Sequence, residues 1–410
     1  MKNKIVILGA GIQGSIVATD LCDRQLSPKE KDLTIVDYDV KKAKEIGDKL
    51  GIKYQQCDVG DSEALDRLLE GSEVVINCVQ YNWNIKIMEA CLRSHSHYID
   101  LGGLFHTTKK QFELHESFND AGLVAILGMG STPGTTNVMA GYAASQLDTI
   151  SDANIFCGCG DFTKTEAVIG IPYSLLTVFE EHTKEPWILK DGKLVAVPGG
   201  SGKKMISFSE PIGVAEGMYC IHSEPAQFER SFKDKGIQNA AFTLSLPKEF
   251  EDRISFLAEL GFANDEPINV GGIEVNPLLT TVAVVNRYLE NYDSSKDGEL
   301  NDCDVLRAEV RGMKDGIEKE IVVETIIRTS KKWGFMAGAL DTGVPPSVVA
   351  QMIVNGDITE TGVCAPEQCV PPILYFKEIG KREMAVYTME KTPLSSDDFK
   401  SLNDVMDREK

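Results

Sequence analysis

The 410-residue chain lacks the features that would assign it to several common classes of protein. It has no apolar run close to the roughly 20 residues that a membrane-spanning helix needs, and its first residues lead into a strand rather than a secretory leader. Its net charge of −20 disfavours nucleic acid and anionic membranes as partners, because phosphate groups would be repelled. We therefore expect a soluble, cytoplasmic protein that binds neither.

Motifs of several enzyme classes are also missing. The chain has no H-E-x-x-H, no nucleophile elbow and no P-loop, so metalloprotease, α/β-hydrolase and P-loop kinase have no support. Its ten cysteines show no paired spacing. Cys157 and Cys159 form a C-x-C without a second half or a nearby histidine to complete a zinc site. We expect reduced thiols and no metal site.

The order of the expected elements indicates an α/β fold. Strands and helices alternate in the first third, which is typical of a parallel sheet covered by helices; the predicted strands are 4–8, 33–36, 53–57, 74–77, 98–100 and 123–127. Longer segments of alternating hydrophobicity follow, with a hairpin turn at Asp315-Gly316. We predict a doubly wound Rossmann domain over 1–135 and an α+β substrate and dimerisation domain, with a mixed or antiparallel sheet, over 136–337.

The last part of the chain is expected to return to the first domain. Helices predicted at 348–353 and 373–381, each after a proline, would pack back on it within 340–385. Residues 391–410 are polar and are predicted to form a frayed tail. Because long antiparallel sheets often carry subunit contacts, we also predict a homodimer.

A glycine motif follows the first predicted strand and opens a helix. In Gly9-x-Gly11-x-x-Gly14, Gly9 would permit a tight turn, Gly11 a close approach to a pyrophosphate, and Gly14 close helix–strand packing. The phosphates would sit at the positive N-terminus of that helix. The motif in this context predicts a dinucleotide site.

Asp37 ends the second predicted strand and bears on which cofactor binds. A carboxylate there accepts hydrogen bonds from both ribose hydroxyls and repels a 2′-phosphate, and Tyr38 and Asp39 supply no arginine. NAD is therefore favoured over NADP; the alternative is that Asp37 caps the helix starting at Val40. Asp58 either reaches the adenine or caps the next helix. The predicted cofactor contacts are Gly9, Gly11, Ile12, Gln13, Gly14, Asp37, Asp58, Asn77 and Val79.

A series of motifs in order along the chain resembles the saccharopine dehydrogenase-like family. They are Gly9–Gly14, Asn77 with Tyr81-Asn82-Trp83-Asn84, Tyr98-Ile99-Asp100, Gly130-x-x-Pro133-Gly134-x-x-Asn137, His222-Ser223-Glu224, Asp341-Thr342-Gly343-x-Pro345 with Ala350-Gln351-Met352, and Gly362-Val363 with Pro366-Glu367. The likeness extends to about position 385 and is greatest to NAD-dependent lysine dehydrogenases. It implies a Rossmann domain, a substrate domain and oxidation of a C–N bond or its reverse.

The sequence contains candidate residues for the groups that such a reaction needs. Hydride transfer from an amine needs a neutral nitrogen, and hence a base. The candidate catalytic residues are Asp100, His106 and His222. Asp100 ends the fifth predicted strand, and His106 lies in the loop that follows that strand. The alternative for Asp100 is capping of the turn at Gly102-Gly103, and a solvated strand edge would also explain His222.

A substrate carboxylate needs a cationic or N–H clamp. Arg230 is the chosen anchor, Tyr173 a hydrogen-bond donor, and Glu224 is expected on the same strand face as His222. Thr132 and Asn137 lie in the loop 130–137, whose amides would bind a carboxylate or the nicotinamide amide. The alternative for that loop is an ordinary helix start capped by Thr135 or Thr136.

We therefore predict an NAD-dependent amino-acid dehydrogenase. Lysine is favoured over saccharopine, because the chain is acidic and its basic residues are dispersed, whereas saccharopine carries three carboxylates. The alternatives are a saccharopine reductase, a carboxynorspermidine dehydrogenase, an NAD-retaining transferase of the polyamine-synthase type, and a non-catalytic NAD-binding regulator.

Overall fold

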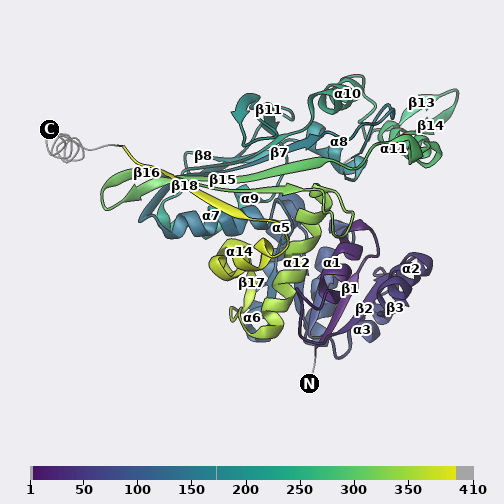
Figure 1. The fold of residues 1–410 in the computed structure, drawn as a ribbon, viewed down its shortest axis with the longest axis horizontal. Helices are drawn as coiled ribbons and strands as arrows, with labels where there is room; N and C mark the ends of the chain where they lie inside the picture. The colour runs from purple at the N-terminus through teal and green to yellow at the C-terminus, as the bar shows by residue number, and fades with distance from the viewer. Residues whose placement is uncertain (1–2, 172, 394–410) are drawn as a thin grey trace.

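The computed structural model describes residues 3–171 and 173–393, so most of the tail predicted at 391–410 lies outside the described residues. The described part contains a seven-stranded sheet, a nine-stranded sheet and a small two-stranded one. Figure 1 shows the seven-stranded sheet with its helices below the long strands of the nine-stranded sheet. Among the described residues no helix is long and apolar enough to cross a membrane.

The first sheet is entirely parallel, as predicted for a Rossmann domain. Its order is β17-β6-β5-β4-β1-β2-β3. The strands are β1 (Lys4–Leu8), β2 (Asp32–Asp37), β3 (Lys53–Gln56), β4 (Val74–Asn77), β5 (His97–Asp100), β6 (Val124–Ile126) and β17 (Gly362–Cys364). The seventh strand, β17, was not predicted, since three residues beginning with glycine carry no periodic signal.

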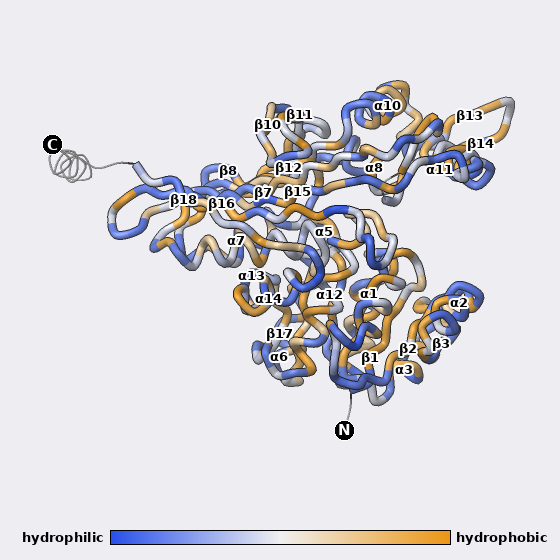
Figure 2. The backbone as a smooth tube through the Cα atoms, in the orientation of Figure 1, coloured by the Kyte–Doolittle hydropathy of each residue, from blue (hydrophilic) through white to orange (hydrophobic). Residues whose placement is uncertain are grey.

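The helices of this domain begin where the sequence supplies caps. Asp39 and Asp61 accept backbone N–H groups at the starts of α2 and α3. The helices are α1 (Ile12–Cys22), α2 (Val40–Leu50), α3 (Ser62–Leu69), α4 (Asn84–Ser94), α5 (Leu104–Gln111) and α6 (His115–Asp120). Figure 2 shows apolar residues in β1 and mainly hydrophilic ones along the outer helix α2. Helix α5 was expected to be part of a glycine loop, which is wrong.

The second sheet is mixed. Strand β12 runs parallel to β7 and the other neighbours are antiparallel. The predicted hairpin is confirmed, with positive φ at Asp315 and Gly316. The strands are β7 (Thr149–Asp161), β8 (Trp187–Lys190), β9 (Lys193–Ala196), β10 (Lys204–Ser207), β11 (Val214–Tyr219), β12 (Asn239–Ser245), β15 (Asp302–Lys314), β16 (Ile317–Arg328) and β18 (Val386–Lys391).

Two long helices lie between the sheets. Helix α7 (Thr135–Ser145) packs against β15 and β16, and α12 (Ala337–Asn355) packs against α1 and the same two strands. The predicted start of α12 after Pro346 is wrong, because Pro345 and Pro346 lie inside the helix. Burial of this segment on both sides outweighs the two lost backbone hydrogen bonds.

The remaining elements are α8 (Leu175–Thr183), α9 (Glu224–Ser231), α10 (Lys248–Glu259), β13 (Ile268–Val270), β14 (Ile273–Val275), α11 (Pro277–Asn291), α13 (Pro366–Cys369) and α14 (Pro372–Gly380).

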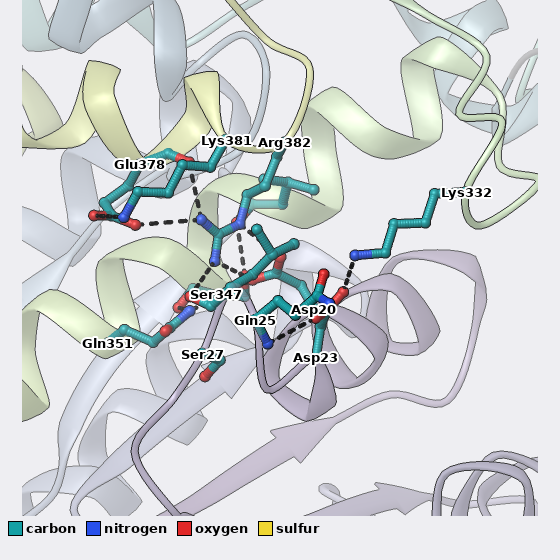
Figure 3. A network of polar contacts seen from close by, with 12 residues as sticks. Asp20, Asp23, Gln25, Ser27, Lys332, Ser347, Gln351, Glu378, Lys381 and Arg382 are labelled. Atoms are coloured by element: carbon teal, nitrogen blue, oxygen red, sulfur yellow. Dashed lines mark hydrogen bonds and ion pairs between the residues drawn. The ribbon is translucent and has the colours of Figure 1, made fainter.

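A buried polar network joins α1 to the segment just after α14 (Figure 3). Arg382, just after α14, donates from Nε to Asp20 Oδ1 at 2.6 Å and from Nη2 to Oδ2 at 3.0 Å. Ser347 of α12 also donates to Asp20. Both members of the ion pair are fully buried, so the network fixes α12 and α14 against the first sheet.

Candidate active site

The glycine turn after β1 has the geometry of a dinucleotide site. Gly9 has φ of +98°, and a Cβ on Gly14 would lie 1.8 Å from the Gly9 carbonyl oxygen. A Cβ on Gly11 would meet nothing within 4 Å, and no side chain caps the helix that follows. Gly9 and Gly14 therefore have the predicted steric roles, and Gly11 leaves open space beside uncapped amides, where the motif predicts the phosphates.

The residues around this turn also fit a dinucleotide. Ile12 is 65% exposed on the first turn of α1, and the buried Oε1 of Gln13 has no hydrogen-bond partner in the part of the chain that the structure describes. Asp37 accepts hydrogen bonds from Ala10 N at 2.7 Å and Asp39 N at 2.9 Å, which places its carboxylate beside the turn. The alternative that Asp37 caps α2 is wrong, because Asp39 does so.

Two further predicted contacts mainly shape their own loops. Asp58 accepts from Gly60 N at 2.8 Å, and since Asp61 caps α3 the capping alternative for Asp58 is wrong. Asn77 is buried: its Nδ2 donates to Asn84 and Tyr98, and its Oδ1 accepts from Val79 N. A contact of Asp58, Asn77 or Val79 with a cofactor stays a prediction.

Asp100 lies at the carboxyl end of β5 but holds loops rather than facing solvent. It is 1% exposed, and its oxygens accept hydrogen bonds from Asn84, Tyr98, Gly102, Gln111 and Gly128. Burial raises the pKa of its carboxyl in spite of these donors. With its oxygens occupied, Asp100 fits the alternative role at the Gly102 turn better than that of a base.

A compact ionisable group lies in the second domain, formed by Tyr173, Glu181, His222 and Glu224. His222 Nδ1 lies 3.1 Å from Glu224 Oε2, and its Nε2 lies 3.5 Å from Glu181 Oε1. Tyr173 donates its hydroxyl to Glu181. We call these four residues the histidine cluster. Its imidazole stacks on the Phe242 ring of β12, with ring centroids 3.8 Å apart.

The cluster is buried and carries excess negative charge. Burial alone would lower the pKa of His222, but Glu224 and Glu181 outweigh it and raise the pKa to about 9. The imidazole is therefore protonated at neutral pH between two glutamates. Glu224 is fully buried, and its Oε1 has no hydrogen-bond partner among the described residues.

The expected local structure of this motif was wrong. His222 lies in the loop after β11, and Glu224 is the first residue of α9, so the two are not on one strand. Their approach comes instead from the turn that begins α9. The motif is anchored to the first domain through Gln227, whose Nε2 donates to Leu127 O at 3.0 Å.

The structure does not place the other candidates in the histidine cluster. His106 is exposed on α5 and meets Trp187 edge-on. Arg230 is exposed on α9, stacks over Phe112, and lines a surface hollow of about 530 Å³. Arg230 is six positions after Glu224 on α9, so the two side chains point in different directions. The choice of Arg230 as anchor beside this cluster is therefore not supported.

The loop at 130–137 is closed internally. Asn137 Oδ1 accepts from Gly134 N at 3.0 Å, so Asn137 and not Thr135 or Thr136 satisfies the start of α7. Its Nδ2 donates to Gln227 and Glu367, so both of its amide hydrogens are used within the protein, and its contact with a ligand stays a prediction. Thr132 is half-buried in the same loop, and its contact with substrate stays a prediction.

Sequence reasoning missed three buried acids: Glu181, which belongs to the histidine cluster, and Asp341 and Asp304, which lie outside it. Glu181 sits in a polar helical run that looks like a solvated face. Asp341 belongs to a motif noted above but was given no role, and Asp304 lies within a strand with no local signal. Their side chains are 4%, 1% and 8% exposed, respectively.

Comparison with known proteins covers nearly the whole chain. Residues 5–126 match the saccharopine dehydrogenase NADP-binding domain, and residues 130–383 match the saccharopine dehydrogenase C-terminal domain. The chain is similar to carboxyaminopropylagmatine dehydrogenase of Synechocystis sp., at 23% identity over 414 residues, covering 96% of this chain and 100% of the relative. It is 25% identical over 400 residues to carboxynorspermidine synthase of Vibrio cholerae, covering 90% and 92%.

Solved structures share the fold. Apo saccharopine dehydrogenase (L-Glu forming) from Saccharomyces cerevisiae superposes with a TM-score of 0.71 at 17% identity, covering 95% of this chain and all of that one. Homospermidine synthase from Legionella pneumophila, in complex with NAD, gives a TM-score of 0.66 at 13% identity, covering 97% and 93%. The architecture of an NAD(P)-binding domain joined to a mixed-sheet domain is thus common to these proteins.

Proposed function

The chain belongs to the saccharopine dehydrogenase family, whose two domains it contains, and from this premise we propose that it is an NAD(P)-dependent dehydrogenase acting on a C–N bond of a carboxylated polyamine. The observation that carries the proposal is the histidine cluster, in which a buried Glu224 oxygen lacks a partner. A buried, unpaired carboxylate oxygen is costly unless a ligand supplies a donor. An amine N–H is such a donor.

The acidity of the site supports a cationic substrate. Two glutamates surround one imidazolium in the histidine cluster, and two more buried acids lie nearby. The sequence-based preference for lysine rested on the same acidity, which a polyamine satisfies with more cationic nitrogens. The names of the relatives in Synechocystis and Vibrio, carboxyaminopropylagmatine dehydrogenase and carboxynorspermidine synthase, also favour a polyamine-type substrate.

The side chains of the cluster suggest how a proton is handled. A nicotinamide dinucleotide held at the glycine turn and Asp37 would accept or deliver the hydride. Glu224 Oε1 is placed to take the proton that a substrate ammonium must lose before its carbon is oxidised. His222, protonated beside it, holds Glu224 through the other carboxylate oxygen, Oε2. Glu224 therefore replaces Asp100 and His106 as our candidate base, with His222 in a supporting role.

We further propose that NAD is the preferred cofactor. Asp37 lies at the turn with its oxygens toward Ala10 and Asp39, and the following Tyr38 is 74% exposed without a cation beside it in the sequence. A 2′-phosphate would meet negative charge there. The predicted homodimer and cytoplasmic location stay predictions; light scattering of the purified protein would measure the subunit number.

The direct test is a spectrophotometric assay of nicotinamide reduction. The purified protein would be given NAD or NADP with carboxyaminopropylagmatine, carboxynorspermidine, L-lysine or saccharopine. We expect turnover with a carboxylated polyamine and NAD, and its loss in Glu224→Gln. The exposed Glu229→Gln on the same helix is the matched control and should retain turnover.

Other outcomes would point elsewhere. Turnover with lysine or saccharopine alone would overturn the substrate class. Conversion of an amine without net NADH formation would indicate a transferase that retains NAD. Cofactor binding with no turnover of any amine would favour a regulator.

A further inference from the structure

Two carboxyl groups outside the histidine cluster approach each other between the two domains. Asp304 is on β15, and Asp341 is in the first turns of α12; they are 8% and 1% exposed. Asp341 Oδ1 accepts from Thr342 Oγ1 at 3.1 Å. The other oxygen, Oδ2, is buried without a partner of normal hydrogen-bond geometry.

No cation of the described residues balances this pair. Within residues 3–171 and 173–393, neither aspartate forms an ion pair with a lysine, arginine or histidine. The groups that act on the two carboxyls are Asp302, Cys159, Ser131 and Thr342. Burial raises the pKa of Asp304 to about 7. Burial, together with Asp304, raises the pKa of Asp341 well above its usual range, so the pair keeps a proton at neutral pH.

The pair shares one face of the second sheet with the histidine cluster. Asp304 is opposite Cys159 of β7, and Cys157 of β7 is opposite Leu244 of β12. Directly paired residues project to the same face, which is also the face of Phe242, on which His222 stacks. Strands β12 and β15 flank β7, so their axes are about 10 Å apart. The charges of Asp304, Asp341 and Glu181 all contribute to raising the pKa of the Cys157 thiol.

We infer that Asp304 and Asp341 form a second cation subsite, which receives a protonated nitrogen of the substrate remote from the reacting C–N bond. The identity of this substrate as a polyamine rests on the proposed function. An ammonium or guanidinium group would donate N–H to Asp341 Oδ2 and balance, in place of the proton that the pair otherwise keeps, the charge of the two carboxylates. As the cation enters, the proton held by the pair leaves to solvent, so ligand binding and proton release are linked.

The test is equilibrium binding of matched ligands by titration calorimetry, which needs no turnover. Agmatine carries a guanidinium and an ammonium, whereas butylguanidine has the same length without the ammonium; putrescine and butylamine form a second such pair. For the wild-type protein we expect each dication to bind about tenfold more tightly than its monocation, the value of a charge-assisted hydrogen bond. Repeating the titrations near pH 7 in buffers of different ionisation enthalpy should show release of up to one proton with the dications only.

The variants Asp341→Asn and Asp304→Asn should abolish both the preference and the proton release. Because each replaces one of two buried acids that no cation of the described residues balances, their melting temperatures should equal or exceed that of wild type. Glu309→Gln is the matched control, since Glu309 lies on β15 five residues away, facing the opposite side of the sheet and pairing with Arg307.

Each result decides the matter. An unchanged dication preference in both variants would overturn the subsite, as would equal weakening of monocations and dications. Loss of the preference in both variants, with Glu309→Gln unaffected, would support it. Because this readout is binding, it stands apart from the turnover assay: a protein that binds dications through Asp341 but oxidises no polyamine would refute the proposed function and keep the subsite.

Discussion

Asp20 and Arg382 are 362 positions apart in the sequence and form a fully buried ion pair. Asp20 is on the helix that follows the glycine turn, and Arg382 follows α14. The pair therefore links the segment after α14 directly to α1, the helix whose N-terminus would bind phosphate. Its bidentate geometry and the third contact from Ser347 satisfy the carboxylate on both oxygens.

Removing one partner of this pair should destabilise the protein strongly. We expect Arg382→Ala to cost about 3–5 kcal/mol, because it leaves a buried carboxylate uncompensated, and to lower the midpoint of urea unfolding. The control is Lys332→Ala, which removes a half-exposed partner of Asp23 and should cost at most about 1 kcal/mol. Equal midpoints for the two variants would contradict this role.

Two glycines of the same motif should respond in opposite ways to alanine. Gly11→Ala adds a methyl group to open space, so the melting temperature should stay near wild type while NAD affinity falls at least about tenfold through a clash with the pyrophosphate. Gly14→Ala drives a methyl group against the Gly9 carbonyl and should cost about 1–3 kcal/mol of stability. Thermal melts and NADH fluorescence titrations measure both effects; undiminished NAD binding by Gly11→Ala would exclude this turn as the phosphate site.

The carboxylate of Asp37 should set the choice of cofactor. We expect Asp37→Asn to weaken NAD binding by roughly tenfold, since a charged acceptor for the ribose hydroxyls is lost, and to weaken NADP binding less or not at all. Asp61→Asn is the control, because asparagine caps α3 as well as aspartate does. A wild-type protein that binds NADP more tightly than NAD would show that Asp37 does not exclude the 2′-phosphate.

His222 should make stability depend on alkaline pH. Its folded-state pKa of about 9 exceeds the value of about 6.5 for an unfolded chain. The stabilisation is therefore complete below about pH 6.5 and is lost as the pH rises through 9, by up to about 3 kcal/mol. Between pH 7 and 10 the wild-type melting temperature should fall more steeply than that of His222→Gln, whereas the exposed His106→Gln should follow wild type. Parallel curves for wild type and His222→Gln would refute the elevated pKa.

The sequence allowed the architecture of the first domain to be predicted better than the side-chain contacts of the second. The glycine turn and the alternation of strands and helices depend on residues close in the chain, where periodicity and turn chemistry operate. The histidine cluster instead joins Glu181 of α8 to His222 and Glu224, and the aspartate pair joins β15 to α12. Those contacts arise from packing between distant segments, for which one sequence carries no local signal. The predicted start of α12 after Pro346 was wrong for the same reason, because burial of α12 outweighs the helix-breaking tendency of Pro345 and Pro346.

Strand β17 has a consequence for how the protein is made. It covers the β6 edge of the nucleotide-binding sheet with residues 362–364, and Arg382 meets Asp20 only after that. On the ribosome, a nascent chain that has emerged through residue 350 still exposes an unpaired sheet edge and an uncompensated aspartate. The nucleotide-binding sheet is thus completed only after residue 364 has been synthesised, and early termination would leave β6 unpaired and prone to self-association.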